Sequence, residues 1–451
     1  MARRGRAVSH PRTMFGILLV GLVSPTVRSP AQAQSGHLTT IYSFAGAPAD
    51  GVEPSGGVVM GANGVLYGTT TWGGAAASGT GVSGDGTVFQ LTPPAATGGT
   101  WTESLLYSFS GPDGAAPRSA LLIGGNGDLY GTASEGGTYG TAFELAPPAA
   151  ARGVWTYTLL HNFQGGADGD YPASALVFGL DGALYGTTSA GGAGCRIPRN
   201  AGCGTAFSLI APASAGGSWS EAVLYAFENY SRPSGLAVGP HGTLFLTGAT
   251  ENDSDGMALR LVRPKQAGAA WSETVLYSNL GATSGVILGP TGVLYGALTL
   301  GSPYYGAIYE VVPPAEKGGP WMESIIYSFT ETNGDGAYPN GYLALAPNGV
   351  LYGATRQGGT TVGCSYNQGC GTLFQLTPPT MPGGAWTETV LYSFSGGVDG
   401  AYPTGPLTIG PNGEIYGTTE FGGTSAACAA GVSGNPYGGC GTVYRFTPPT
   451  P

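Results

Sequence analysis

The chain has 451 residues, of which 42% are hydrophobic and only 9% are charged, so it is long enough to bury an extensive core. Its 16 basic and 26 acidic side chains give a formal net charge of −10. Nucleic acids and anionic membrane surfaces bind clustered lysine and arginine, so the composition argues against both as partners. The 83 glycines and 34 prolines would indicate low complexity without a period, but here they recur at fixed intervals.

The N-terminus has the order of a secretory signal. Four arginines at positions 3, 4, 6 and 12 precede an apolar run over residues 14–23, and Ala31-Gln32-Ala33 forms a small-residue cleavage site. We therefore expect residues 1–33 to be removed during export, by the general or the twin-arginine route. The remaining residues 34–451 keep 11 basic and 26 acidic side chains, a net charge of about −15. No segment of this mature chain has the roughly 20 apolar residues that a membrane-spanning helix needs.

A phrase related to Leu-Tyr-Gly-Thr-Thr occurs seven times. Its aromatic residue lies at Tyr67, Tyr130, Tyr185, Phe245, Tyr295, Tyr352 and Tyr416. The 349 residues between the first and the last give a mean period of about 58, which suits a four-stranded propeller blade. The repeats at Phe245 and Tyr295 are degenerate, because both lack an Asp-Gly turn.

The last complete repeat predicts four strands. Residues 407–410, 414–419 and 441–446 read as the inner, second and third strands, and residues 396–403 read as a turn. The β-branched and aromatic segment 386–394 reads as the outer strand of the preceding blade. With this phase, residues 38–44 are an unpaired outer strand that completes the last blade and removes its free edge. The sequence thus predicts an all-β, seven-bladed β-propeller of four-stranded antiparallel blades over residues 34–451, and we expect a monomer.

Six cysteines form three local pairs, each within one inter-strand loop. They are Cys195 with Cys203, Cys364 with Cys370, and Cys428 with Cys440. Export favours oxidation, so we expect three loop-closing disulfides. A zinc site is the less favoured alternative, because no histidine or short Cys-x-x-Cys spacing accompanies the pairs.

Two repeated motifs carry acidic residues. The Asp-Gly turns hold Asp50, Asp113, Asp168, Asp335 and Asp399, which we interpret as caps of their own backbone amides rather than as calcium ligands. The Trp-x-Glu pairs of the outer strands begin at Trp101, Trp219, Trp271, Trp321 and Trp386, and we interpret them as inter-blade packing with a charge that guards the strand edge.

The position two residues before the paired glycines after the second strand varies from repeat to repeat. It holds Trp72, Glu135, Ala190, Glu251, Leu300, Gln357 and Phe421. We expect ligand-binding residues here and at the neighbouring Glu420, with Trp72 and Phe421 as an aromatic shelf for a sugar ring and Glu135 and Glu420 accepting hydroxyl protons. The alternative is that these loop residues simply cover one another.

Three phrases recur together in fixed order, at residues 64–70, 86–94 and 390–394 in their clearest copies. The chain resembles in this respect the GloVer (Gloeo/Verruco) tandem-repeat family of exported bacterial proteins. The resemblance implies a propeller-like repeat domain and implies no activity or catalytic residues.

The leading hypothesis is a secreted, extracellular or periplasmic, non-enzymatic module that binds a glycan or a cell-surface protein on its long-loop face, without a cofactor or metal. No catalytic residue is assigned. A polysaccharide hydrolase or lyase remains the alternative, because Glu135, Glu251, Asp253, Asp255 and Glu420 are carboxylates on that face. A third possibility is a structural surface-layer component.

Overall fold

The structure is a computed structural model. It describes residues 36–449 except 76–83, 97, 151–152, 194–202, 215, 229–230, 250–255, 267, 281, 301–304, 317, 360–363, 365–367, 382 and 429–437. The predicted leader, residues 1–33, and Glu251 therefore lie outside the described residues. Among the residues that are described, no helix has the length and apolar character needed to cross a membrane.

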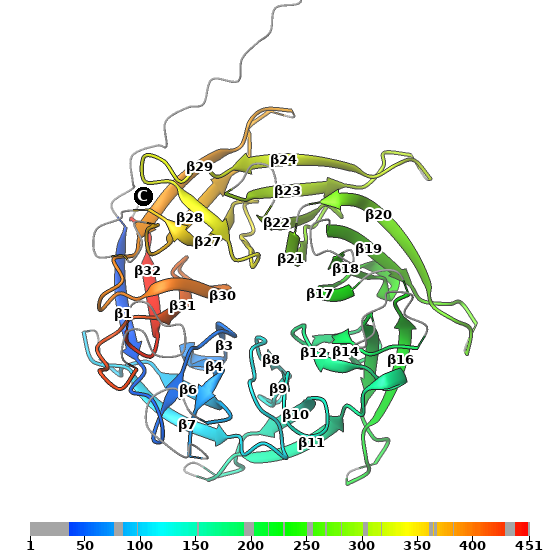
Figure 1. The fold of residues 1–451 in the computed structure, drawn as a ribbon, viewed down its shortest axis with the longest axis horizontal. Coiled ribbons are helices and arrows are strands. Elements are labelled where there is room, and N and C mark those ends of the chain that lie inside the picture. Colours follow the sequence, from blue (N-terminus) through cyan, green and yellow to red (C-terminus); the bar gives the residue numbers. More distant parts are fainter. Residues whose placement is uncertain are drawn as a thin grey trace, which may run out of the picture.

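Seven antiparallel sheets are arranged as the blades of a propeller (Figure 1). From inner to outer strand, the first blade contains β3 (Val58–Met60), β4 (Leu66–Thr70), β6 (Thr87–Thr92) and β7 (Thr102–Ser108). The second blade contains β8 (Leu122–Ile123), β9 (Leu129–Ala133), β10 (Thr141–Ala146) and β11 (Thr156–Asn162). The third blade contains β12 (Asp170–Pro172) with β13 (Val177–Phe178), then β14 (Leu184–Ala190), β15 (Thr205–Ile210) and β16 (Ser220–Ala226).

The next three blades follow the same order. The fourth blade contains β17 (Ser231–Val238), β18 (Leu244–Ala249), β19 (Gly256–Val262) and β20 (Ser272–Leu280). The fifth blade contains β21 (Ala282–Leu288), β22 (Leu294–Leu300), β23 (Ala307–Val312) and β24 (Met322–Ser328). The sixth blade contains β25 (Gly336–Pro339) with β26 (Ala344–Leu345), then β27 (Leu351–Gly358), β28 (Thr372–Thr377) and β29 (Thr387–Ser393). Short 3-10 turns lie at η1 (Ala62–Gly64), η2 (Gly166–Asp168) and η3 (Pro240–Gly242).

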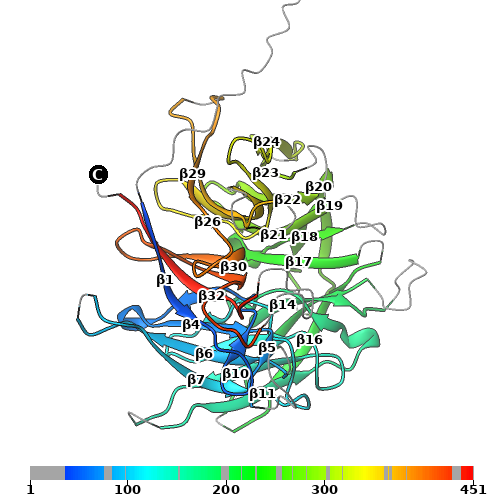
Figure 2. The ribbon, with the colours of Figure 1, turned by 60° about the vertical axis from the view of Figure 1, so that its left-hand side comes forward.

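The seventh blade closes the ring with strands from both ends of the chain. It contains β30 (Ala401–Ile409), β31 (Ile415–Phe421), β32 (Thr442–Thr447) and the N-terminal β1 (His37–Ser43). β1 pairs antiparallel with β32, from His37 opposite Thr447 to Ser43 opposite Thr442, and the two strands lie side by side in Figure 2. This confirms the predicted propeller and its closure by the amino-terminal strand.

The inner strands are longer than predicted, because residues assigned to the Asp-Gly turn also pair with the second strand. In the seventh blade Ala401 lies opposite Phe421 and Pro403 opposite Thr419, within β30. The corresponding pairing forms β12, β25 and the two-stranded ladder of β2 (Gly51–Val52) with β5 (Trp72–Gly73). The interpretation of residues 396–403 as a turn was therefore wrong for 401–403. A proline can occupy this edge because its missing N–H lies on the side without a partner strand.

Glycine allows the inner strands of neighbouring blades to approach closely at the centre of the ring. Gly405 has φ +68, and a Cβ there would lie 2.4 Å from the backbone nitrogen of Gly57 in the first blade. Only glycine fits both the backbone conformation and the contact. This agrees with the expectation that the small-residue strand lies innermost.

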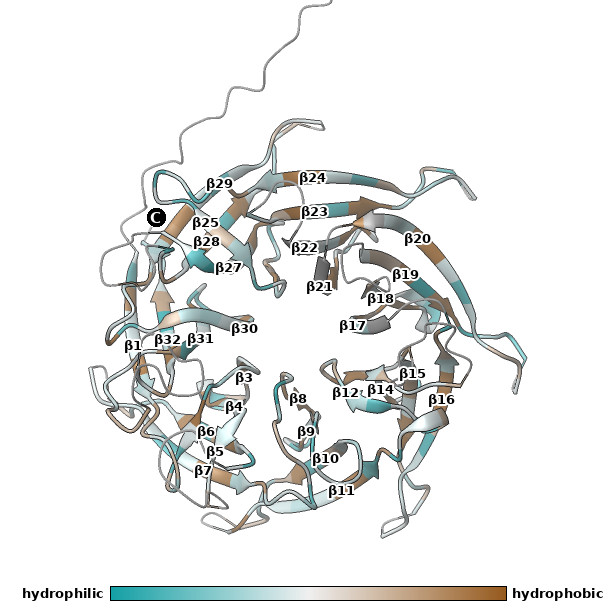
Figure 3. Cartoon of the chain, viewed as in Figure 1, coloured by the Kyte–Doolittle hydropathy of each residue, from teal (hydrophilic) through white to brown (hydrophobic). Residues whose placement is uncertain are grey.

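Aromatic residues of successive repeats form the core between blades. The phenylalanine that ends the Leu-Tyr-Ser-Phe phrase is fully buried and lies against the third-strand aromatic residue of the next blade, as in Phe44 with Phe89 at 5.0 Å and Phe394 with Tyr444 at 5.1 Å between ring centroids. Hydrophobic and hydrophilic residues are interleaved along strands such as β20 and β24 (Figure 3). Each repeat therefore buries its apolar side chains only when its neighbours are present.

Candidate functional site

The aspartates of the Asp-Gly turns are caps. Asp50 accepts hydrogen bonds from the Tyr42 hydroxyl at 2.8 Å, from the Ala45 N–H at 2.6 Å and from the Gly51 N–H at 2.6 Å. Asp113, Asp168, Asp335 and Asp399 likewise each accept from a backbone N–H of their own loop. These carboxylates hold the loop that leads from one blade to the next, as the repeated pattern indicated.

Six of the seven tryptophans belong to the scaffold. Each lies at the start of an outer strand, and its ring lies 5.8 to 6.3 Å from the aromatic residue of the Leu-Tyr-Gly phrase in the preceding blade; the pairs are Trp155 with Tyr67, Trp219 with Tyr130, Trp271 with Tyr185, Trp321 with Phe245, Trp386 with Tyr295, and Trp101 with Tyr416. Trp72 is the seventh. It has no counterpart in the other repeats.

Glu388, of the Trp-x-Glu pair that begins at Trp386, differs from the expectation. Glu388 is only 5% exposed, and neither of its carboxylate oxygens has a hydrogen-bond partner among the described residues. Burial, and then the charge of Asp335, raises its pKa to about 8. The interpretation as an edge-guarding charge was therefore wrong for this residue, because the side chain turns toward the neighbouring blade rather than toward water.

The predicted binding position lies at the end of the second strand, beside the long loops. Trp72 pairs with Val52, Glu135 with Ala115, Gln357 with Ala337, and Phe421 with Ala401. All four occupy the same place in their blades, next to the inner strand. Glu251, the equivalent residue of the fourth blade, lies outside the described residues.

The residue before the proline of each intact Asp-Gly turn has a positive φ angle. The values are +58 at Glu53, +52 at Ala116, +54 at Tyr171, +55 at Tyr338 and +56 at Tyr402. A residue with a Cβ adopts this left-handed conformation at a cost, and all the more so before proline. This strained position, next to the predicted binding position, thus carries tyrosine in three blades and glutamate or alanine in the other two.

The first half of the candidate site lies on the first and second blades. The Arg118 guanidinium lies over the Trp72 ring, 5.7 Å from its centroid, and 3.5 Å from the carboxylate of Glu135. Glu53 lies close by, and its pKa is raised to about 7, mainly by burial and then by the charge of Glu420, while Arg118, Trp72 and Arg356 oppose the shift. Trp72 and Glu135 therefore contact the same guanidinium group.

The second half lies on the sixth and seventh blades. Arg356 donates to the carboxylate of Glu420 at 2.9 Å, and its guanidinium lies 4.9 Å from the centroid of the Tyr402 ring. The Gln357 amide nitrogen lies 3.5 Å from the Tyr402 hydroxyl. Because Glu53 interacts with both arginines and with Glu420, the two halves form one group, which we call the mouth cluster: Glu53, Trp72, Arg118, Glu135, Arg356, Gln357, Tyr402 and Glu420.

Phe421 does not present its ring as expected. It is 4% exposed and lies 5.7 Å from the ring of Tyr402, between ring centroids. A buried ring offers no face to a sugar, so the predicted shelf of Trp72 and Phe421 is reduced to Trp72. Phe421 instead packs beneath the strained Tyr402.

A pocket of about 430 Å³ adjoins the second half of the mouth cluster. It is lined by Thr299, Tyr338, Pro339, Asn340, Arg356, Pro403, Thr404 and Glu420. This volume lies in the range of small-molecule sites, and the lining combines prolines with an ion pair and hydroxyl groups.

Four members of the mouth cluster were missed in the sequence, namely Glu53, Arg118, Arg356 and Tyr402. The signal was present, because each residue stands at a position that varies between repeats. Glu53 and Tyr402 precede the turn proline, Arg118 follows it, and Arg356 lies one residue before the predicted binding position. The positions of Glu53 and Tyr402 were assigned to a turn, and those of Arg118 and Arg356 were not singled out, so their proximity to Trp72 and Glu420 was not recognised.

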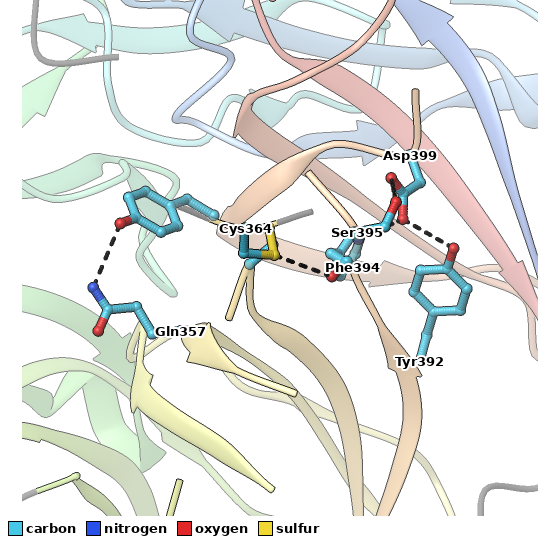
Figure 4. The surroundings of a disulfide bond; sticks show 8 residues. Gln357, Cys364, Tyr392, Phe394, Ser395 and Asp399 are labelled. Carbon is cyan, nitrogen blue, oxygen red and sulfur yellow. Dashed lines mark hydrogen bonds between the residues drawn. A yellow bond between two sulfur atoms is a disulfide. The ribbon is translucent and has the colours of Figure 1, made fainter. Parts of the chain in front are cut away.

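Two of the three predicted disulfides are present. Cys364 is bonded to Cys370 and Cys428 to Cys440. Figure 4 shows the surroundings of the first, with Gln357 of the mouth cluster on one side of Cys364 and the hydrogen bond of Tyr392 to Asp399 on the other. Cys195 lies outside the described residues, so its bond to Cys203 stays a prediction.

Several solved structures match this chain at low sequence identity. PhoX from Pseudomonas fluorescens, in complex with the transition state analogue vanadate, has 11% identity and a TM-score of 0.46 and covers 93% of this chain and 97% of its own. A luciferin-regenerating enzyme has 14% identity and a TM-score of 0.44, and the match covers 72% of this chain and 90% of the enzyme's chain. A putative glucose dehydrogenase from Thermus thermophilus has 15% identity and a TM-score of 0.39, covering 91% and 99%.

None of the curated proteins matches the sequence. The model of the Gloeobacter/Verrucomicrobia repeat matches residues 76–278, which include the two outer strands of the first blade, the second and third blades, and most of the fourth blade. This match confirms the resemblance to the Gloeobacter/Verrucomicrobia repeat family that the repeated phrases indicated.

Proposed function

We propose that this chain is an exported, non-enzymatic binding module that holds a carbohydrate at the mouth cluster. The single observation that carries the proposal is the convergence of Trp72, two arginines and three glutamates from four blades, all at positions that differ between repeats. Residues that only maintain the repeated scaffold are expected to be alike from repeat to repeat. The two disulfides and the absence of a membrane-crossing helix among the described residues agree with an extracellular or periplasmic location.

The chemistry of the mouth cluster suits a hydroxyl-rich ligand. Trp72 offers an aromatic face to the apolar side of a sugar ring, and the Arg118–Glu135 and Arg356–Glu420 pairs offer donors and acceptors for adjacent hydroxyls. Three of these four charged side chains are about half exposed, and Glu420 is 19% exposed. They can therefore exchange their mutual contacts for contacts with a ligand.

A glycan array probed with the chain spanning residues 34–451 tests the proposal. We expect selective binding that Trp72→Ala weakens at least tenfold, because the variant lacks the stacking face. Tyr139→Ala is the matched control, since Tyr139 is an exposed aromatic residue of a long loop outside the mouth cluster. No saturable glycan binding, or equal loss in both variants, would contradict the proposal.

One observation favours a polysaccharide hydrolase as the second candidate. Glu53 and Glu420 interact electrostatically, and a pKa of about 7 at Glu53 is in the range of a general acid. The same chain is then expected to release reducing ends from the bound glycan. Glu53→Gln separates the two functions, because a hydrolase loses turnover while keeping binding, whereas a binding module shows no turnover in either form.

A further inference from the structure

One histidine replaces a scaffold tyrosine at the boundary between the second and third blades. In other repeats the outer-strand tyrosine donates its hydroxyl to the turn aspartate, as Tyr42 does to Asp50 at 2.8 Å and Tyr392 to Asp399 at 3.0 Å. The equivalent residue on β11 is His161, whose Nε2 lies 3.0 and 3.1 Å from the two carboxylate oxygens of Asp168. An imidazole, unlike a neutral phenol, is a good ligand for a divalent metal ion.

A third ligand comes from the neighbouring blade. Glu221 on β16 faces the same pair, and the nearest donor atoms of His161, Asp168 and Glu221 all lie within 4.8 Å of one another. Glu221 Oε1 is buried without a hydrogen-bond partner among the described residues. An unpaired buried carboxylate oxygen is unfavourable, and a cation held by the three groups would satisfy it.

The site is reachable from solvent, because the side chains of His161 and Asp168 are 21% and 20% exposed. One imidazole nitrogen with two carboxylates is a borderline ligand set that zinc accepts and that calcium or magnesium does not prefer. We propose that His161, Asp168 and Glu221 form a zinc site that links the second and third blades. A solvent molecule would complete the tetrahedral coordination.

In the apo protein the His161 Nε2 and Asp168 pair with each other, so a metal ion must replace that hydrogen bond. Zinc then binds neutral imidazole and ionised carboxylates, so its affinity falls when these ligands are protonated. The sequence contained no metal motif, because the ligands are separated by 7 and 53 residues along the chain.

Isothermal titration with Zn²⁺ tests the site in the chain spanning residues 34–451. We expect the wild-type chain to bind one Zn²⁺ ion tightly. His161→Tyr restores the side chain that other repeats carry, so we expect this variant to keep its fold while its zinc affinity falls at least a hundredfold. Glu221→Gln keeps the shape of the side chain and is expected to lower the affinity about tenfold or more.

A second readout follows from the position of the site between two blades. Zn²⁺ is expected to raise the Tm of the wild-type chain by several degrees and to leave that of His161→Tyr unchanged. Ca²⁺ at the same concentration should leave the Tm of both chains unchanged. Absence of saturable Zn²⁺ binding, unchanged affinity in His161→Tyr, or equal stabilisation by Ca²⁺ would overturn the assignment.

Discussion

Glu388 illustrates how a repeated carboxyl behaves once blades pack against each other. It lies on β29 beside Asp335, which is 2% exposed and accepts hydrogen bonds from the N–H and hydroxyl of Thr330 and from the Gly336 N–H. Asp335 is thus satisfied as an anion, and Glu388, which faces it without partners of its own, keeps its proton. Glu103 and Glu221, the equivalent residues of the first and third blades, also have a pKa raised to about 7 by burial and then by the turn aspartate.

This arrangement predicts that stability falls as the pH rises. The pKa of Glu388 is 4.5 when unperturbed and about 8 in the folded chain, so the native state binds the extra proton between these values. The free energy of unfolding should therefore decrease from about pH 5 to pH 8, by on the order of a few kcal/mol for this group. Glu388→Gln, which mimics the protonated form, should flatten the dependence of Tm on pH.

The exposed Glu316→Gln variant is the control for this measurement, because it removes the same charge from the surface. Thermal unfolding at half-unit intervals from pH 5 to pH 8.5 compares the three chains. An identical slope in wild type and Glu388→Gln would show that Glu388 is ionised throughout.

At the scale of the strand, the tryptophan at the start of each outer strand connects one blade to the next. Trp219 on β16 contacts Tyr130 on β9 at 6.1 Å between ring centroids. Edge-to-face contact of this kind adds to the area buried by the rings. Closure is the exception, because Gly36 precedes β1 where the other repeats have tryptophan, and a Cβ there would lie 2.0 Å from the Phe446 ring.

Two tryptophan substitutions separate scaffold from site. Trp219→Ala is expected to lower the free energy of unfolding by about 2–4 kcal/mol, because it leaves a cavity between blades. Trp72→Ala is expected to change it by less than about 1 kcal/mol, since no repeated contact is lost. Denaturant unfolding of both variants measures the difference, and equal destabilisation would place Trp72 in the scaffold.

At the scale of the whole molecule, β1 joins the two ends of the chain. Leu38 lies opposite Phe446, and Phe44, immediately after β1, is fully buried. Without β1, the edge of β32 would present unpaired backbone groups and the apolar core of the seventh blade would be open.

Removal of residues 36–44 is therefore expected to destroy the single cooperative unfolding transition and to cause association through the exposed edge. A chain that begins at Gln34 is the control and should remain monomeric with one transition. Calorimetry together with light scattering after size exclusion measures both properties. A shortened chain that unfolds like the control would contradict closure by β1.

The number of blades, their strand order and the closing strand were all predictable from the sequence, because each depends on a short pattern that is repeated and on turns that act locally. The caps of the Asp-Gly turns and the inter-blade role of the tryptophans were predictable for the same reason. The state of Glu388 was not, since its environment is formed by a loop that precedes it by about one repeat.

Only the tertiary structure determined which exceptional side chains meet. Arg356 and Glu420 are 64 residues apart, and His161 and Glu221 are 60 apart, yet each pair converges because the ring places adjacent blades side by side. Arg356 and Glu420 occupy equivalent positions of their blades, whereas His161 and Glu221 occupy different positions on two neighbouring outer strands. The repeat marks such residues as exceptions, but their contacts depend on side-chain direction and burial across the blade boundary. Phe421 and Glu53 are two further examples. The ring of Phe421 is turned inward, and a strained backbone holds Glu53 toward the arginines.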